Sequence, residues 1–238
     1  MPTCRLCRRD RTLRESHIVP KFMYADLKNK GRQIMGITGS GRKGWALIQD
    51  GVKEFLLCDD CEQHINKHYE TPFKRFWIDS QPLPDPWMDE EPRWLTTDYG
   101  PFKLFHLSVL FRASICSLSM FRTVNLGPHE DRLRKMLLNV EPGQDYEYPI
   151  GGYSVVHHKS RQLIKMVTQS QNFRLGGKPC YAIMYGGAEW WFSVSSDRNP
   201  EFEQFSLKQD GRICLAVHPW TEVAAVQKAS SALRRAGA

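Results

Sequence analysis

The sequence has no long apolar segment. Nowhere in its 238 residues do apolar residues run together over the roughly 18 positions that a membrane-spanning helix requires. The first residues, Met1–Arg5, are polar and basic, without the apolar run of a secretory signal peptide. We therefore expect no membrane partner and a cytoplasmic location.

The marks of two other classes are also missing. No internal repeat is evident, which argues against a solenoid or a propeller. The glycine-rich basic stretch Gly39–Gly44 lacks the Lys-Ser/Thr pair, the preceding strand and the following helix of a phosphate-binding loop. The sequence therefore does not predict a nucleotide-binding site of that type.

The composition is that of a globular protein with a basic surface. The chain is 41% hydrophobic and 25% charged, which is enough to bury a core in one large domain or two small ones. The formal net charge is +7, with many of the Lys and Arg residues in the first fifty positions. That balance favours an anionic partner such as nucleic acid.

Cysteine usage divides into two groups. Four of the seven cysteines form two Cys-x-x-Cys pairs, Cys4 with Cys7 and Cys58 with Cys61. Two such pairs supply the four thiolates of a tetrahedral structural Zn²⁺ site. The other three stand in apolar contexts, and we expect them to be buried free thiols without disulfides; they are Cys116, Cys180 and Cys214.

Local patterns predict the elements between the two cysteine pairs. Pro20 favours an extended chain up to Val19. A short helix is expected over 21–30, and strands over 45–57 around the turn dipeptide Asp50-Gly51. From Asp59 onward apolar residues recur at every fourth position, which predicts a helix with one buried face; that face carries Cys61, Ile65, Tyr69 and Phe73.

These motifs together resemble a known family. The two cysteine pairs, the segment His17–Pro20 and the helix after Cys61 are similar to the HNH (ββα-metal) endonuclease module in its zinc-bearing, treble-clef form. The resemblance covers residues 1–78. It implies two strands and a helix around one catalytic Mg²⁺ or other divalent ion, and hydrolysis of phosphodiester bonds in double-stranded DNA, in a context such as bacterial defence.

The resemblance assigns roles to individual residues. His17 matches the general base, and a neutral imidazole suits that role at cellular pH. Glu62 and Asn66 fall where the helix supplies ion ligands, and both offer the oxygen atoms that Mg²⁺ prefers. Ser16 stands where the family carries an Asp or His ligand, and Lys53 stands in place of its asparagine.

Other residues near this site offer alternatives. His64 and His68 lie one helical turn apart and are a second candidate pair of ion ligands. Arg42, Lys43 and Lys53 are candidate contacts to nucleic-acid phosphates.

The remainder of the chain has no comparable signature. An acidic, proline-rich connector is expected over 79–101, and a helical plus sheet-forming domain over 102–238. Within that domain His106 is expected in the core, and Arg112 must find a partner if it is buried. We predict a buried helix at 102–124, an amphipathic helix from Gly127, an antiparallel sheet, and a surface helix at 223–235; the sheet strands are expected at 146–156, 162–168, 180–185 and 189–194.

The sequence thus predicts an α+β protein. It begins with a zinc-stabilised ββα-metal module and continues through helices into an antiparallel sheet. The expected function is metal-dependent DNA hydrolysis. A non-catalytic zinc module that binds nucleic acid or a protein is the alternative, favoured by Ser16 and Lys53 where His17 and Glu62 favour the enzyme. The pattern does not indicate an oligomeric state.

Overall fold

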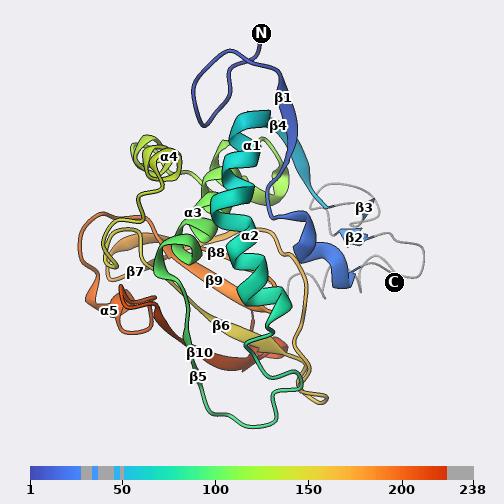
Figure 1. Cartoon of the computed structure of the whole chain (residues 1–238). Helices are drawn as coiled ribbons and strands as arrows, with labels where there is room; N and C mark the ends of the chain where they lie inside the picture. Colours follow the sequence, from blue (N-terminus) through green and yellow to red (C-terminus); the bar gives the residue numbers. More distant parts are fainter. Residues whose placement is uncertain (28–33, 37–45, 49–50, 224–238) are drawn as a thin grey trace.

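The computed structural model describes residues 1–27, 34–36, 46–48 and 51–223. It confirms the α+β class: a six-stranded sheet is covered on one face by helices, and the N-terminal residues form a smaller unit at one end (Figure 1). Arg42, Lys43, the stretch Gly39–Gly44 and nearly all of the helix expected at 223–235 lie outside the described residues. No helix among the described residues is long and apolar enough to cross a membrane.

The smaller unit is built on two short antiparallel strands. Strand β1 (Leu13–His17) pairs with β4 (Lys53–Cys58), and His17 lies opposite Lys53. Asp50 of the expected Asp50-Gly51 turn lies outside the described residues. The strands on either side of it do not pair with each other: β3 (Ala46–Ile48) pairs with β2 (Ile34–Gly36), whereas β4 pairs with β1. The end of β4 is buried against the cysteine pair of the N-terminus. The short helix expected after Pro20 is the 3₁₀ helix η1 (Lys21–Leu27).

One continuous helical rod follows β4. It comprises α1 (Asp59–Ile65), the π-helical turn η2 (Asn66–Glu70), α2 (Thr71–Lys74) and a second π-helical turn, η3 (Arg75–Asp79). A four-residue step in an α-helix overshoots a full turn by about 40°, and the wider π turns offset that drift. The predicted stripe therefore stays buried along the rod, and it extends to one further residue; its members are Cys61, Ile65, Tyr69, Phe73 and Trp77.

The next helix is the centre of the molecule. Helix α3 (Tyr99–Ile115) is buried on nearly all sides, as its apolar sequence predicts. It ends before residue 124, because the chain turns extended at Cys116 and the Ser117 amide donates to the Glu54 carboxylate at 2.8 Å. A 3₁₀ turn, η4 (Ser119–Phe121), and the amphipathic helix α4 (His129–Asn139) follow.

The large sheet is mixed rather than antiparallel. Its strand order is β5-β10-β6-β9-β8-β7, and β10 runs parallel to β6. A strand returning from the far end of the chain sets that direction, which hairpin patterns do not predict. The strands expected at 146–156, 180–185 and 189–194 are present, and two further strands join them; the five that follow α4 are β6 (Ile150–Val156), β7 (Gln171–Leu175), β8 (Lys178–Tyr185), β9 (Ala188–Ser193) and β10 (Arg212–Pro219).

The prediction of a strand at 162–168 is wrong. That segment makes only an isolated bridge between Leu163 and Val156, whereas the more polar Gln171–Leu175 forms β7. The reason is the turn: Gly176 and Gly177 both have positive φ, at 54° and 73°, and close a hairpin that fixes β7 against β8. A short helix, α5 (Pro200–Glu203), lies between β9 and β10.

The connector is more ordered than its prolines suggest. Strand β5 (Arg93–Thr96) lies within it and pairs with β10, and Trp87 is fully buried. One hydrophobic core contains residues from the N-terminal unit, the connector and the sheet. The domain boundaries at residues 78 and 101 stay a prediction. The hydrophobic core continues across both positions.

Aromatic packing joins the rod and α3 to the sheet. The rings of Phe73 and Phe105 stack with centroids 3.6 Å apart. The Trp77 indole donates to the Gly186 carbonyl at 2.8 Å, and a Cβ at Gly186 would lie 2.8 Å from the indole nitrogen. His106 is fully buried, as expected, and its Nδ1 lies 2.6 Å from the Tyr185 hydroxyl.

Candidate functional site

The first cysteine pair lies in a tight knuckle at the start of the chain. The Arg8 amide donates to the Cys4 carbonyl at 2.9 Å, and the Cys4 amide donates to the Arg9 carbonyl at 2.9 Å. Arg8 adopts a left-handed conformation, with φ of 61°, which turns the chain back after Cys7. The knuckle therefore points both sulfurs of the pair to the same side.

The second pair completes a four-sulfur cluster. The Sγ atoms of the four cysteines all lie within 4.8 Å of one another, and those of Cys7 and Cys58 are 3.9 Å apart. A Zn–S bond of about 2.3 Å in a tetrahedral site places neighbouring sulfurs roughly 3.8 Å apart. The observed spacing fits such an ion, so the prediction that these four residues converge on a metal-binding cluster is confirmed in its geometry.

The cluster is largely buried, and hydrogen bonds already favour the thiolate form of Cys4. Cys4, Cys58 and Cys61 are buried, and Cys7 is half-buried. A hydrogen bond from the Cys61 thiol lowers the pKa of Cys4 to about 4, and the Cys58 amide donates to the Cys4 sulfur at 3.3 Å. A thiolate is the form that binds a metal ion. The three remaining cysteines are free thiols. Cys180 is buried as expected, whereas Cys116 and Cys214 are only half-buried.

An open pocket with several charged and polar side chains in its wall lies beside this cluster. It has a volume of about 460 Å³ and is lined by the end of β1, the helix η1, the rod and α3. The predicted residues His17, Glu62 and Asn66 line it together. The rest of the wall is formed by Pro20, Lys21, Phe22, Ala25, Glu70, Lys74 and Arg112.

Ser16 holds one of the pocket carboxylates. It is fully buried, its hydroxyl donates to Glu62, and the same oxygen accepts from the Leu57 amide at 3.2 Å. Burial raises the pKa of Glu62, while the nearby Arg112 charge and the Ser16 hydrogen bond oppose that rise. Ser16 therefore orients an acidic side chain in this structure, at the position where the resembled family carries a ligand of its own.

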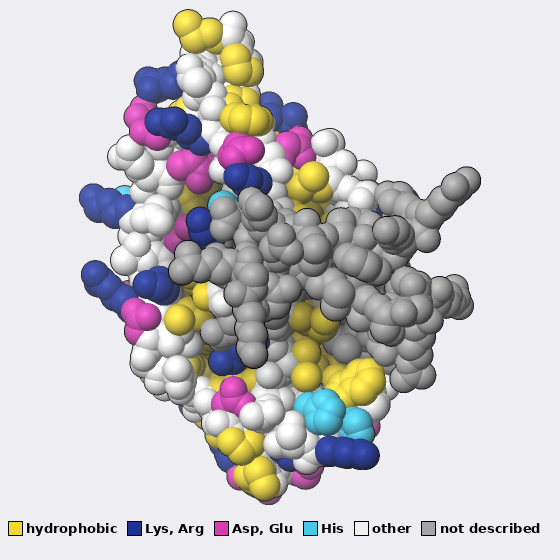
Figure 2. All heavy atoms as spheres, turned by 90° about the vertical axis from the view of Figure 1, so that its right-hand side faces the viewer, with side chains coloured by type: hydrophobic (Ala, Val, Ile, Leu, Met, Phe, Trp, Pro, Cys, Tyr) yellow, Lys and Arg dark blue, Asp and Glu magenta, His cyan; other side chains and the backbone are white. Residues whose placement is uncertain are grey.

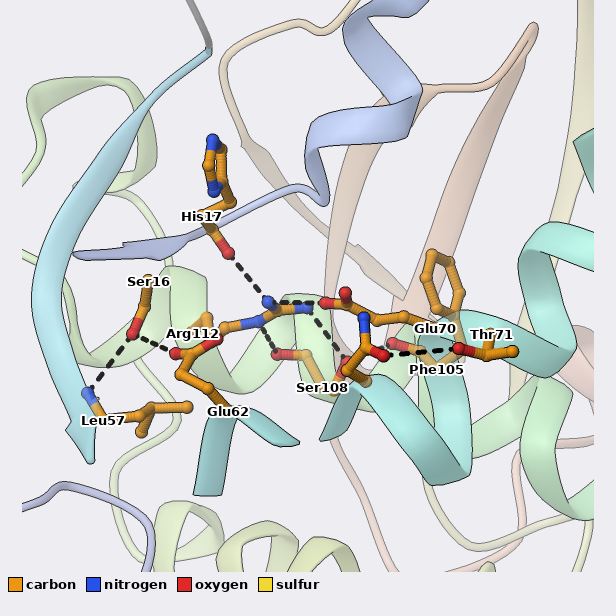
Figure 3. A network of polar contacts seen from close by, with 10 residues as sticks. Ser16, His17, Leu57, Glu62, Glu70, Thr71, Phe105, Ser108 and Arg112 are labelled. Atoms are coloured by element: carbon orange, nitrogen blue, oxygen red, sulfur yellow. Dashed lines mark hydrogen bonds and ion pairs between the residues drawn. The ribbon is translucent and has the colours of Figure 1, made fainter. Parts of the chain in front are cut away.

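Arg112 forms part of the pocket wall, and it has the partners that its sequence context requires. Only 1% of its side chain is exposed. One terminal nitrogen donates to the His17 carbonyl at 2.8 Å and to Glu70 at 2.9 Å. The other two nitrogens donate to the carbonyl and hydroxyl of Ser108. Figure 3 shows the guanidinium lying between the end of β1 and the rod.

His17 contributes its main chain and its ring in different directions. Its carbonyl faces Arg112, whereas its half-buried imidazole extends away from the guanidinium (Figure 3). Lys53, directly opposite on β4, forms an ion pair with Glu15. Lys53 is therefore engaged within the small sheet rather than presented as an unshared cation.

The alternative pair, His64 and His68, does not line the pocket. Nε2 of His64 donates to the Leu137 carbonyl at the end of α4 at 2.8 Å, and the Tyr69 hydroxyl also reaches that carbonyl. The two imidazole centroids are 4.8 Å apart, and burial lowers the pKa of His68. Asn66, by contrast, lines the pocket, and its side-chain oxygen accepts from the Thr71 hydroxyl at 3.3 Å.

The N-terminal arginines are largely neutralised. Figure 2 shows basic and acidic side chains interspersed over the N-terminal end, and four arginines there form ion pairs. Lys74, which is exposed on the rim of the pocket, is a cation placed next to the candidate site. The arginines in these ion pairs are Arg5, Arg8, Arg11 and Arg14.

Among the charged residues of the pocket, sequence reasoning did not name Lys21, Glu70, Lys74 or Arg112 as site residues. Glu70 and Lys74 do have a signal, because positions 62, 66, 70 and 74 recur at fourfold spacing, each one residue after a member of the apolar stripe and about 100° from it around the helix. Arg112 has no local signal, because its partner His17 is 95 residues away in the sequence. Comparison of the chain with protein-family models, with curated proteins and with solved structures gave no match.

Proposed function

We propose that this chain is an HNH-like, metal-dependent endonuclease that hydrolyses phosphodiester bonds in DNA. The observation that supports it is one pocket in which a histidine at the end of a strand meets oxygen-bearing side chains from the following helix. The β1, β4 and rod arrangement, clamped at one end by four cysteines, is compatible with the ββα-metal module that the sequence resembles.

The two metal sites in this proposal have different roles. A shell of four thiolates is closed and has no position for a substrate, so the cysteine cluster would hold a structural Zn²⁺. The pocket instead offers carboxylate and amide oxygens from Glu62 and Asn66, which are hard ligands suited to Mg²⁺ or Mn²⁺. When bound there, such an ion would polarise a phosphate oxygen as a Lewis acid.

The other residues at the site have direct roles. His17 takes a proton from the attacking water, the general-base role that histidine serves most often. Lys74, on the rim, is placed to contact a substrate phosphate. Ser16 keeps Glu62 oriented toward the pocket through its hydrogen bond.

The decisive experiment measures cleavage of plasmid DNA, and of single-stranded DNA and RNA, with Mg²⁺, with Mn²⁺ and with EDTA. We expect cleavage of duplex DNA that requires the added ion. His17→Ala should lower the rate by about 10²-fold or more, the usual contribution of a general base. Glu62→Ala should also lower it, and a higher Mg²⁺ concentration should restore part of the loss.

Matched controls separate these effects from damage to the fold. His68→Ala removes an imidazole from the same rod outside the pocket, so the rate should stay close to wild type. Zinc content and DNA affinity of His17→Ala should be unchanged, because affinity comes mainly from cation–phosphate contacts. If His17→Ala cleaved as fast as wild type, the assignment of the base would be wrong.

The salt dependence of DNA binding examines the role of Lys74. Losing one phosphate contact reduces the slope of log affinity against log salt concentration by about 1. We expect this reduction in Lys74→Ala. Lys135→Ala, on α4 and already paired with Asp131, should leave the slope as it is.

A second function is favoured by one observation. Ser16, which stands where the family carries a ligand, and Lys53, which stands in place of its asparagine, are both engaged in bonds within the protein. A non-catalytic zinc module that binds nucleic acid or a protein partner would need no more than this. Metal-independent DNA binding without cleavage of any nucleic acid would support that alternative.

A further inference from the structure

The family resemblance covers residues 1–78. The rest of the described chain contributes one residue, Arg112, to the lining of the pocket. Arg112 belongs to α3, yet its guanidinium contacts the end of β1 and the rod. Four of its five N–H groups have protein acceptors, counting both bonds from one terminal nitrogen. Arg112 therefore ties three separate elements together at the wall of the pocket.

The presence of a buried ion pair of this kind is weak evidence that the pair stabilises the fold. Replacing such a pair by apolar side chains is often neutral or stabilising, whereas removing one partner alone is strongly destabilising. The pair between Arg112 and Glu70 lies at the pocket wall, with side-chain exposures of 1% and 14%. Its position indicates a role in the geometry of the site.

Glu70 faces both Arg112 and the pocket. Its Oε1 accepts from Arg112 at 2.9 Å, and Glu70 lines the cavity with Glu62 and Asn66. The three residues recur at fourfold spacing, and the last two begin and end the π-helical turn η2. Such wide turns inside α-helices are frequent at functional sites. Here the turn keeps Asn66 and Glu70 on the pocket side of the rod.

We infer that Glu70 is a third oxygen ligand of the divalent ion in this pocket, and that Arg112 is the positioning residue that orients it. Arg112 fixes one carboxylate oxygen, and the other is left for the ion. The same guanidinium holds the main chain of His17. The inference depends on the proposed function for the presence of the ion, and it means that α3 completes the site.

Binding of Mn²⁺ to the zinc-loaded full chain examines this directly, by electron paramagnetic resonance of free Mn²⁺. We expect one Mn²⁺ site in wild type in addition to the zinc. Glu70→Gln should weaken Mn²⁺ binding by about tenfold or more, and Arg112→Lys by about 10–100-fold, the usual effect of losing a group that orients a ligand. Lys cannot reproduce the forked contact to two acceptors.

Arg134→Lys is the matched control. Arg134 comes from α4, and it also donates to a main-chain carbonyl of the N-terminal unit, that of Leu6 at 2.9 Å. It also pairs with a carboxylate, Asp131, at 2.8 Å, but lies outside the pocket wall. Arg134→Lys should leave Mn²⁺ affinity unchanged. Equal weakening in Arg112→Lys and Arg134→Lys would overturn the inference, because it would indicate a general loss of stability.

Chemical rescue is a second measurement. We expect it to give no change in Mn²⁺ affinity if the role of Arg112 is purely structural. Arg112→Ala leaves a cavity shaped for a guanidinium ion beside Glu70. Millimolar guanidinium, far below the molar concentrations that unfold proteins, should restore part of the Mn²⁺ affinity in Arg112→Ala and have no effect in Glu70→Ala. The absence of any rescue in soluble, zinc-loaded Arg112→Ala would count against the positioning role.

The outcomes separate this inference from the proposed function. If wild type binds Mn²⁺ through Glu70 and cleaves no nucleic acid, the nuclease function fails and the ion site stands. If wild type cleaves DNA and the Glu70→Gln and Arg112→Lys variants match it in Mn²⁺ affinity and rate, the function stands and the inference is wrong. If wild type binds no Mn²⁺ besides the zinc position, the inference is wrong irrespective of cleavage.

Discussion

The two ends of this molecule are held together by different means. At the N-terminal end the knuckle before β1 and the junction of β4 with α1 bring four sulfur atoms together, and several of the surrounding contacts are exposed ion pairs. At the other end a six-stranded sheet packs against α3 through buried aromatic rings, among them Phe102, His106 and Trp190. A small unit built around a metal site depends on that metal for much of its stability, whereas a large sheet with a helical cover does not. The predictions below test this contrast.

The largest expected effect is at the cysteine cluster. Structural zinc contributes apparent free energies of about 10–16 kcal/mol to small zinc modules. Cys58→Ser should therefore lose most of the zinc, about one per chain, and unfold the N-terminal unit. Zinc analysis and amide hydrogen exchange measure this, with protection expected to persist in β8 and β9. Cys214→Ser, which changes a cysteine outside the cluster, should keep both zinc and protection.

The second effect is at the sheet. Trp190 is fully buried and its ring centroid lies 4.1 Å from that of His106. Trp190→Ala should lower the free energy of unfolding by about 3–5 kcal/mol, as large aromatic deletions in cores do. Urea denaturation measures this, and the zinc content of the folded variant should stay at the wild-type value. Trp94→Ala is the control, since 63% of Trp94 is exposed and its loss should cost little.

This contrast between the two ends would be wrong if Cys58→Ser affected the sheet or if Trp190→Ala affected the cysteine cluster. Zinc loss in folded Trp190→Ala, or loss of amide protection in β8 and β9 of Cys58→Ser, would show that both ends form a single cooperative unit.

These two regions also differ in how well the sequence predicts them. The cysteine cluster follows from spacing alone, because each Cys-x-x-Cys pair brings its two sulfurs together within one turn. The buried stripe of the rod follows from its fourfold period. Such signals come from residues close together in the sequence, so they do not depend on how distant parts of the chain pack.

The sheet and the pocket depend on contacts between distant residues. The parallel pairing of β10 with β6 and the entry of β5 beside β10 have no signal in the short segments involved. Likewise Ser16 can be placed at the end of a strand from sequence, but its bond to Glu62 requires the fold. The role of Arg112 could be anticipated only as a need for a partner.

A moderate effect is expected from pH, at the sheet end. Burial lowers the pKa of His106 well below its usual range, and its ring Nε2 has no hydrogen-bond partner among the described residues. The unfolded chain binds a proton at His106 below pH of about 6.5, whereas the folded protein does not. Stability from this group is therefore complete above that pH and is lost as pH falls, with a slope approaching about 1.4 kcal/mol per pH unit.

The variant that isolates this slope is His106→Gln, which removes the titrating ring. Urea denaturation from pH 7.5 to pH 5 should give a shallower fall in the free energy of unfolding for His106→Gln than for wild type. Parallel curves for the two proteins would assign the acid sensitivity to other groups.

The smallest effect is expected from the exposed ion pairs of the N-terminal end. Arg14 and Asp59 are 2.9 Å apart, with 62% and 49% of their side chains exposed. Exposed pairs contribute about 0–1 kcal/mol. A double-mutant cycle with Arg14→Ala and Asp59→Ala should give a coupling energy in this range, and zinc content should not change. A coupling of several kcal/mol would show that ion pairs, and not the metal, hold this end.

The position of β10 has a consequence for synthesis of the protein. The strand occupies an interior position in the sheet, between β5 and β6, yet it is made after every other strand of the described residues. Bacterial and eukaryotic ribosomes add about 5–20 residues per second, so β6 waits on the order of ten seconds, and β5 about twice as long, for their common neighbour. During that time both expose unpaired main-chain edges, which invite pairing with other chains. Slower translation of the last fifth of the message should therefore increase aggregation of the newly made chain.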